Sequence, residues 1–265
     1  MINLSASTYY KKPIYLRAEE EERDADIRGQ IEAVRVEFPR AGYRTLQEYL
    51  KRRGVDVGEY RLRKVLRKFS LHIKIKRRFV RTTDSNHSHR VFPNLLGDHL
   101  VTRLNEAWVS DITYIRIGNG FVYLAVILDL YSRMVVGWQI SKKIDGELAL
   151  DALKMAYERR KGPKGVIHHS DRGVQYLCEK YISFLKDHDF KVSCSRKGNP
   201  YDNAFAESFM KTIKTEEVYL FHYETILDVV ERIGRFIEEV YNEKRVHSSL
   251  EYLTPKEFES LKKVE

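Results

Sequence analysis

The chain has few cysteines and no long apolar run. Its 265 residues include two cysteines, Cys178 and Cys194, with no Cys-x-x-Cys spacing. This argues against a disulfide framework or a zinc finger, and we expect a protein of the reducing cytoplasm. The longest uninterrupted apolar stretch, residues 121–128, is far too short to cross a bilayer, and the first residues lack the pattern of a secretory signal. We therefore expect no membrane partner.

Basic residues outnumber acidic ones, and the excess lies in one part of the chain. Residues 1–100 carry 22 basic and 13 acidic side chains, whereas residues 101–265 carry 25 of each. The excess is greatest over residues 61–81, which contain ten basic residues and no acid. One-sided basic segments of this kind bind phosphate backbones. A solvated basic helix face is the alternative, and we favour nucleic acid.

Three helices are predicted ahead of residue 70. Apolar residues at three- and four-residue spacing indicate helices over 25–38, after Gly42 with Thr45 as a cap, and over 59–69. Two helices joined by a short connection, the second of them basic, are typical of a helix-turn-helix module. A three-helix bundle that does not touch DNA fits the same pattern.

The third of these helices carries the candidate DNA contacts of this region. Arg61, Lys64 and Lys68 fall together on one side of it, away from its apolar face. Since phosphate oxygens are the usual partners of clustered cations, we predict that these three side chains bind DNA.

Beyond residue 104 the pattern changes to strands that alternate with helices. We predict strands over 108–117, 121–129, 134–141, 166–170 and 191–193, and helices over 146–160, 178–188 and 204–218. A loop rich in turn-forming residues, 198–202, precedes the last of these helices. Three meandering strands followed by alternating helices and strands indicate an α/β fold with a mixed sheet.

Three acids stand out in this part of the chain. Asp111 lies within the first strand, Asp171 follows the fourth, and Glu207 lies on the helix that begins at residue 204. Between them lie 59 and then 35 residues. Three converging carboxylates raise one another's pKa unless a cation lies between them, and hard oxygen ligands favour Mg²⁺ or Mn²⁺. We predict that Asp111, Asp171 and Glu207 are catalytic residues and metal ligands.

Two lysines share a helix face with Glu207. At 100° per residue, Glu207, Lys211 and Lys214 fall within about 60° of one another. The opposite side carries an apolar stripe of Phe205, Phe209 and Ile213. A carboxylate beside two ammonium groups suits a site that grips a phosphodiester, so we predict that Lys211 and Lys214 bind DNA. A surface Glu–Lys pair is the alternative interpretation.

Several blocks of the sequence together resemble one family. The blocks are Trp108-x-x-Asp111-Ile112-Thr113-Tyr114, Asp129-Leu130-Tyr131-Ser132-Arg133, His169-Ser170-Asp171-x-Gly173-x-Gln175-Tyr176, Asp202-Asn203-Ala204-x-x-Glu207-Ser208-Phe209 and Tyr241-Asn242-x-x-Arg245-x-His247-x-x-Leu250. In this order they resemble the catalytic subunit (OrfB) of bacterial transposases of the insertion-sequence-three family. The resemblance extends over nearly the whole chain.

The resemblance implies a fold and a reaction. The fold is the RNase H-like core of retroviral integrases, a five-stranded mixed sheet of order 3-2-1-4-5 flanked by helices. In this order the first and fourth strands are neighbours, which brings Asp111 and Asp171 together. Two ions are implied, with Asp111 touching both and Asp171 and Glu207 holding one each. Water would first free a 3′-hydroxyl at the end of an insertion sequence. That hydroxyl would then attack another phosphodiester.

The resemblance also implies domains and partners. We expect an N-terminal tail over 1–18, a helix-turn-helix-like DNA-binding domain over 19–81, a linker over 82–103 and the catalytic core with C-terminal helices over 104–265. Double-stranded DNA is the expected substrate, and a homo-oligomer is expected on it. Residues 5–10 resemble the start of a downstream reading frame, so the product of an upstream frame (OrfA) is an expected partner or fusion.

Two other classes of protein fit parts of the pattern. A ribonuclease H or structure-specific nuclease would use the same acids for hydrolysis alone, and would prefer an RNA–DNA hybrid to DNA ends. A non-catalytic DNA-binding remnant of a transposase would have no need of the three acids. The sequence leaves open the roles of five further motif residues, namely Arg133, His169, Gln175, Arg245 and His247.

Overall fold

The structure is a computed structural model that describes residues 14–73, 92–97, 99–196 and 203–262. The chain divides into two compact units, residues 1–77 and 78–265. The loop predicted over 198–202 and much of the predicted linker lie outside the described residues. The functional division into tail, DNA-binding domain, linker and core remains a prediction.

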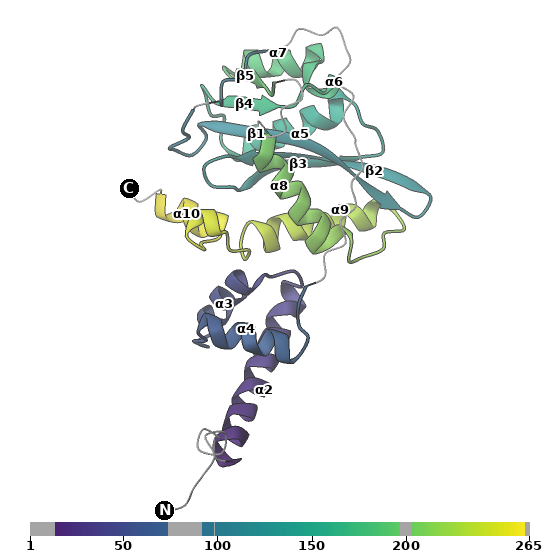
Figure 1. The fold of residues 1–265 in the computed structure, drawn as a ribbon. Helices are drawn as coiled ribbons and strands as arrows, with labels where there is room; N and C mark the ends of the chain where they lie inside the picture. Colours follow the sequence, from purple (N-terminus) through teal and green to yellow (C-terminus); the bar gives the residue numbers. More distant parts are fainter. Residues whose placement is uncertain (1–13, 74–91, 98, 197–202, 263–265) are drawn as a thin grey trace, which may run out of the picture. The chain divides into compact units, whose positions relative to one another are not determined.

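The first unit contains three helices (Figure 1): α2 (Ile14–Glu37), α3 (Tyr43–Arg52) and α4 (Glu59–Lys68). All three predicted helices are present, but α2 begins inside the segment predicted as a tail. The prediction that Thr45 caps α3 is wrong. The cap residue is Gly42, which makes no side-chain hydrogen bond, and Thr45 lies within the helix because the helix already begins at Tyr43.

The apolar faces of these helices form the core of the first unit. The buried side chains of this core come from α2, α3 and α4 and include Ile31, Val34, Leu46, Leu50, Leu62 and Val65. Phe38 and Tyr49 stack with their ring centroids 4.1 Å apart. The three- and four-residue spacing seen in the sequence therefore identifies the packed faces correctly.

The second unit is built on a five-stranded sheet of order β3-β2-β1-β4-β5 (Figure 1). Its strands are β1 (Ala107–Ile117), β2 (Gly120–Asp129), β3 (Val135–Ser141), β4 (Ile167–Ser170) and β5 (Lys191–Cys194). The first three form an antiparallel meander, and β4 and β5 join it in parallel. The predicted mixed sheet and its strand order are confirmed.

The helices of this unit follow the predicted order with two differences. They are α5 (Gly146–Arg159), α6 (Val174–Leu177), α7 (Glu179–Asp187), α8 (Ala204–Ile213), η2 (Lys214–Val218), α9 (Ile226–Arg235), η3 (Phe236–Tyr241), η4 (Ser248–Leu250) and α10 (Pro255–Lys262). The short α6 was not predicted. The helix predicted over 204–218 turns from α- to π-helical geometry at Lys214. Within the described ranges, no helix has the length and apolar character needed to span a membrane.

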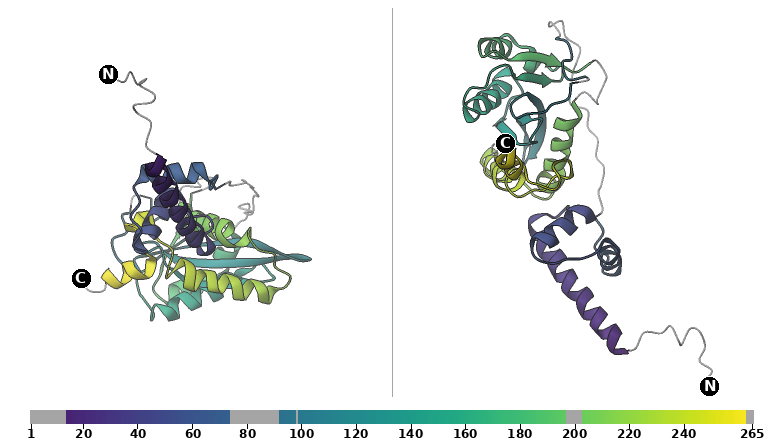
Figure 2. Two further views of the ribbon diagram at one scale, coloured as in Figure 1. Left: turned by 90° about the horizontal axis from the view of Figure 1, so that it is seen from below. Right: turned by 90° about the vertical axis from the view of Figure 1, so that its left-hand side faces the viewer.

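Helices cover both faces of the sheet (Figure 2). One face packs against α8, α9 and η3, where Phe209, Ile213 and Ile233 are buried. The other face packs against α5 and α7, where Leu153, Tyr181 and others are buried. Of the three acids, Asp111 lies within β1, Asp171 directly follows β4, and Glu207 lies on the first turn of α8.

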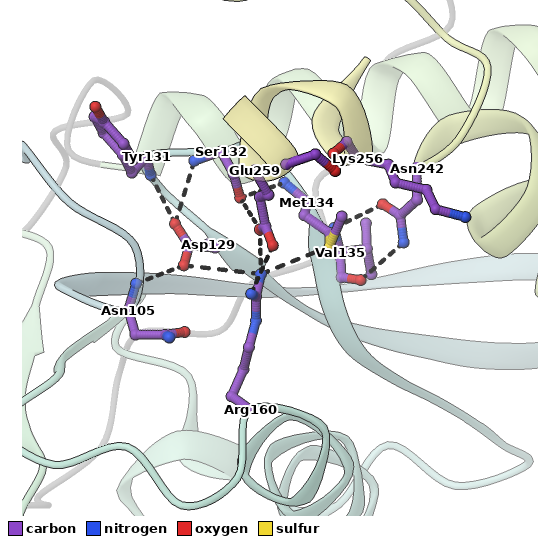
Figure 3. Close-up of polar contacts among 11 residues, drawn as sticks. Asn105, Asp129, Tyr131, Ser132, Met134, Val135, Arg160, Asn242, Lys256 and Glu259 are labelled. Carbon is purple, nitrogen blue, oxygen red and sulfur yellow. Dashed lines mark hydrogen bonds and ion pairs between the residues drawn. The ribbon is translucent and has the colours of Figure 1, made fainter. Parts of the chain in front are cut away.

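A buried polar network attaches the C-terminal helix α10 to the sheet (Figure 3). Asp129, at the end of β2, is fully buried and accepts hydrogen bonds from the backbone N–H groups of Asn105 (2.8 Å), Tyr131 (2.9 Å) and Ser132 (3.2 Å). The Glu259 carboxylate of α10 accepts a hydrogen bond from the Ser132 hydroxyl at 2.6 Å and pairs with the Arg160 guanidinium. The network thus links segments of the second unit that are far apart in the sequence.

Candidate active site

The pairing of β1 with β4 brings the two aspartates to one edge of the sheet. The strands run parallel with Val109 opposite His169, and each aspartate lies two residues further along its strand. Asp111 accepts a hydrogen bond from the N–H of Ile112 at 2.8 Å. Asp171 accepts one from the N–H of Gly173 at 2.9 Å. Asp111 within β1 and Asp171 just past the end of β4 are thus each held by a local backbone donor.

Electrostatics couple Asp111 to both other acids. Burial and the charge of Asp171 raise the pKa of Asp111 to about 7, and the charge of Glu207 acts in the same direction with a smaller effect. The Ile112 N–H and the Lys214 ammonium oppose this rise in the pKa. A carboxyl that is half-buried beside two further acids is stabilised as an anion by a cation.

Glu207 lies on the first turns of α8, next to β1. The Asn203 side chain at the start of this helix donates a hydrogen bond to the backbone oxygen of Ser110 at 3.2 Å, one residue before Asp111. Glu207 itself is exposed, and partial burial of its carboxyl raises its pKa.

The apolar stripe of α8 differs from the prediction at one residue. Phe209 and Ile213 are buried, but Phe205 is 47% exposed. Ala206 and Met210 are buried in addition, because the face that packs on the sheet is centred about 80° from Phe205.

The three acids do not form a ready-made ligand set. Among the described residues, no group of three His, Cys, Asp or Glu side chains is arranged closely enough to hold a metal ion. Asp111 nevertheless lies within electrostatic reach of both other acids. The assignment of Asp111, Asp171 and Glu207 as joint metal ligands therefore stays a prediction.

Lys214 lies on the same side of the helix as Glu207 and within electrostatic reach of Asp111. Its ammonium is 4.8 Å from the centre of the Tyr114 ring on β1. Burial lowers the pKa of Lys214, and the charge of Asp111 opposes that effect. Lys211, one turn earlier, is exposed. Of the two lysines, Lys214 thus borders Asp111, and the predicted DNA-binding role of both stays a prediction.

Gly173 leaves room for the Asp171 carboxylate. In the sequence, the only sign of this was the Asp-x-Gly spacing. A methyl group at Gly173 would lie 2.7 Å from the Gln175 Oε1 atom and 2.9 Å from the Asp171 Oδ1 atom. Both distances are shorter than real carbon–oxygen contacts of this kind. A side chain at position 173 would therefore force the Asp171 carboxylate, the Gln175 amide or both to rotate away.

His169 is part of the packing between β4 and β5. Its ring is fully buried, with Nδ1 2.8 Å from the Ser193 hydroxyl and Nε2 3.1 Å from the Ser195 hydroxyl. Ser195 in turn donates its N–H to the backbone oxygen of Ser170 at 3.0 Å. The sequence left the role of His169 open, and this geometry fits packing support of the end of β4, just before Asp171.

In the first unit, two of the three predicted DNA contacts are engaged inside the protein. Asp24 of α2 is buried, and its carboxylate binds Arg61 and Lys68 of α4 at 3.0 Å each. Burial raises the pKa of Asp24, but Lys68 and Arg61 together hold it below the usual value. Lys64 is exposed, as are Arg63 and Arg67. Arg63 stacks on the Tyr43 ring at 4.2 Å.

Comparisons with known proteins agree with the fold and with the sequence blocks. Integrase core domain families match residues 101–200 and residues 188–255. The chain is 35% identical over 260 residues to an insertion element IS600 uncharacterized 31 kDa protein from Shigella sonnei, a match that covers 97% of this chain and 96% of that protein. It is 38% identical over 222 residues to transposase InsF for insertion sequence IS3A from Escherichia coli K12, covering 83% and 77%.

A solved structure shares the fold at lower identity. A chain of the simian T-cell lymphotropic virus intasome, determined in complex with PP2A regulatory subunit B56 gamma, superposes with a TM-score of 0.51 at 16% identity and covers 80% of this chain and 69% of that chain. At this identity the match shows a common fold alone. The sequence matches go further: the chain belongs to the IS3 family of transposases and carries an integrase core domain.

Proposed function

We propose that the chain cuts and joins DNA strands at the ends of an insertion sequence, with Asp111, Asp171 and Glu207 as its catalytic acids. The observation that carries the proposal is the electrostatic coupling of Asp111 to both other acids, which with burial raises its pKa to about 7. In a member of a transposase family, such a cluster at the edge of the integrase-like sheet fits DNA strand transfer.

The donor set fits Mg²⁺, with Mn²⁺ as a substitute, because it consists of carboxylate oxygens from Asp111, Asp171 and Glu207. When bound, two such ions would polarise the scissile phosphate and neutralise the charge that develops on the attacking and leaving oxygens. Asp111, central to the electrostatic coupling, would contact both ions, and Asp171 and Glu207 one each. An ion shared by all three requires the acids to come closer than they lie in this structure.

The chain's own residues would then orient the DNA end. Lys214 lies near Asp111, and Lys211 is exposed one turn earlier on the same helix. Both would bind phosphate oxygens next to the reacting one. In the first step water adds to phosphorus and one P–O bond breaks, which frees a 3′-hydroxyl. In the second step that hydroxyl forms a new P–O bond as another breaks. The number of phosphodiester bonds is unchanged in the second step, so no ATP is needed.

The helical unit supplies a second DNA surface under this proposal. Its partner is double-stranded DNA, bound through the exposed cations of α4. Lys64 stays in the predicted set and Arg63 and Arg67 join it, while Arg61 and Lys68 mainly neutralise Asp24. Under this proposal the chain assembles as a homo-oligomer on DNA. It also acts with the product of an upstream reading frame (OrfA), either as a partner or as a fusion.

Charge-removing, shape-preserving substitutions test the acids. Asp111→Asn, Asp171→Asn and Glu207→Gln should each nearly abolish strand transfer in Mg²⁺ while leaving duplex binding intact. Asp151→Asn is the matched control, because Asp151 is an exposed residue of the same unit that pairs with Lys154 at 3.8 Å. Robust strand transfer by any of the three variants contradicts the assignment. Cleavage of an RNA–DNA hybrid in preference to DNA ends would instead identify a nuclease. Inactivity of the unaltered chain even when the upstream-frame product is supplied, with DNA binding retained, would identify a remnant.

A further inference from the structure

The first turn of α8 is attached to the sheet unit at two points. On one side, the Asn203 amide donates a hydrogen bond to the backbone of β1 next to Asp111, at 3.2 Å. On the other side, the Phe205 ring lies beneath the Arg133 guanidinium, whose central carbon is 3.8 Å from the ring centroid. Both contacts fall within four residues of Glu207, so they define where the helix that carries this acid begins.

Arg133 occupies an unusual backbone position from which this contact is made. It lies in the turn between β2 and β3, where its N–H donates to the Asp129 backbone oxygen at 2.9 Å. Its φ angle is +62°, in the left-handed region that non-glycine residues seldom adopt. A residue held in such a conformation at a cost indicates that its side chain is needed there.

The Arg133 side chain is not held in place by an ion pair with a described residue. Among the described residues it makes none with a carboxylate within 4.0 Å, and its Nη1 atom is buried without a hydrogen-bond partner. The contact of its guanidinium with the Phe205 ring is one interaction that the turn conformation provides, while the charges of Asp129 and Tyr241 also act on the guanidinium. Such a contact depends on the planar guanidinium, which lysine lacks.

We propose that Arg133 is a positioning residue for Glu207, acting by stacking on Phe205 and thereby fixing the first turn of α8. Phe205 precedes Glu207 by two residues on the same helical turn, so a tilt of that turn displaces the acid. A displacement of about 1 Å in a reacting group can lower a rate about 100-fold. The inference rests on the proposed role of Glu207.

Two features of the structure allow matched variants. One is the left-handed φ angle of Arg133, and the other is a second arginine–phenylalanine contact in the same unit. Arg133→Gly removes the guanidinium at a φ angle that glycine adopts without strain. Arg133→Lys keeps the charge but not the flat face. Phe205→Leu is matched by Phe221→Leu in the same unit, because the two rings are 47% and 46% exposed and Phe221 also lies under a guanidinium, that of Arg232 at 3.4 Å.

Two measurements on the full chain test the proposal. In the metal-free protein, Arg133→Gly and Phe205→Leu should speed hydrogen exchange of the amides over 203–207, and Phe221→Leu should not. In strand transfer, both variants and Arg133→Lys should lower the maximal rate about 10- to 100-fold and raise the Mn²⁺ concentration for half-maximal rate. The double variant Arg133→Gly with Phe205→Leu should be no slower than the slower single variant, since both remove one contact.

The outcomes separate this inference from the proposed function. Unchanged exchange in Arg133→Gly, or faster exchange with an unchanged rate, overturns the positioning role. A lower rate with unchanged exchange and metal dependence also overturns it, and would indicate a direct DNA contact. If Glu207→Gln remained active while exchange over 203–207 rose in Arg133→Gly, the proposed function would fail and the stacking contact would stand as a structural one.

Discussion

At the scale of single residues, the site depends on small features next to the acids. Asp171 has room for its carboxylate because Gly173 has no side chain, and Asp111 is held in a half-buried position near two other acids. Neither feature strengthens the fold. Both are understandable if the carboxylates are arranged for a ligand, since active sites commonly sacrifice stability for such arrangements.

Gly173→Ala should lower activity without unfolding the protein. The added methyl group would contact Asp171 Oδ1 at 2.9 Å and Gln175 Oε1 at 2.7 Å, so one or both side chains must rotate. The backbone itself allows alanine, because φ is −62°. We expect strand transfer to fall roughly 10- to 100-fold, with a change of less than about 1 kcal/mol in the free energy of unfolding. Gly120→Ala, where a methyl group meets nothing within 4 Å, is the control. Equal activity of the two variants would contradict the interpretation.

Asp111→Asn should stabilise the metal-free protein in a pH-dependent way. Burial and the charge of Asp171 raise the pKa of Asp111 from its ordinary value of 3.8 to about 7 in the fold. Below pH about 4 the carboxyl is protonated in both states, so it costs no stability. Between these values only the unfolded chain releases the proton, which favours unfolding, and above pH 7 the cost is complete. Removing it should gain on the order of 2 kcal/mol at pH 8.

Thermal unfolding in EDTA across pH 4–8 measures this gain. The difference between Asp111→Asn and the unaltered protein should grow as the pH rises through this window. Asp151→Asn, on the surface of α5, should show no such trend. A constant difference at all pH values would mean that the acidic neighbours of Asp111 do not raise its pKa.

At the scale of elements, the basic residues of α4 fall into two groups by their contacts. Arg61 and Lys68 turn toward the buried carboxylate of Asp24 on α2 and hold the two helices together. Arg63, Lys64 and Arg67 face solvent. The first pair therefore contributes mainly to folding, and the second group is the one available to phosphates.

Substitutions in the two groups of α4 residues should have different effects. Replacing Arg63, Lys64 and Arg67 with Ala should weaken duplex binding at all sequences and reduce the slope of log affinity against log salt by up to roughly one unit per lost phosphate contact. Arg61→Ala or Lys68→Ala should instead destabilise the helical unit by about 1–3 kcal/mol, because Asp24 stays buried with one cation fewer. Titration of DNA binding against salt, with thermal unfolding beside it, distinguishes the two. An unchanged salt slope in the triple variant would remove α4 from the DNA surface.

At the scale of the whole chain, the C-terminal helix α10 completes the second unit through buried charges (Figure 3). Glu259 joins Arg160 at the end of α5 and Ser132 after β2, which are 99 and 127 residues away in the sequence. The Asp129 carboxyl lies in the same network, and burial raises its pKa. The motif Asp129-Leu130-Tyr131-Ser132-Arg133 therefore has a structural part, in Asp129 and Ser132, beside the role proposed for Arg133.

Glu259→Ala should destabilise the protein strongly. The Arg160 side chain is 11% exposed and the Glu259 side chain 5%, so removal of the acid leaves a buried guanidinium without its main partner. The expected loss is about 3–5 kcal/mol. Lys256→Ala, on the same helix, breaks a pair with Glu243 whose side chains are 60% and 45% exposed, and should cost less than about 1 kcal/mol. Chemical denaturation of both variants measures the contrast. Similar losses would mean that α10 is held by its apolar contacts alone.

The sequence by itself determined the strands, most helices and the motif blocks of this protein. These features are local, because apolar periodicity identifies the face of each element that packs. The pairing of β1 with β4 is not local, and it was expected only from the resemblance of the motif blocks to a known family. Only the tertiary structure decided which cations are free, because Asp24 lies 37 residues from Arg61 and 44 from Lys68. Only the tertiary structure also showed that Phe205 is exposed and that the Arg133 guanidinium lies over its ring. Such contacts depend on how helices and turns pack across long separations, which no local pattern records.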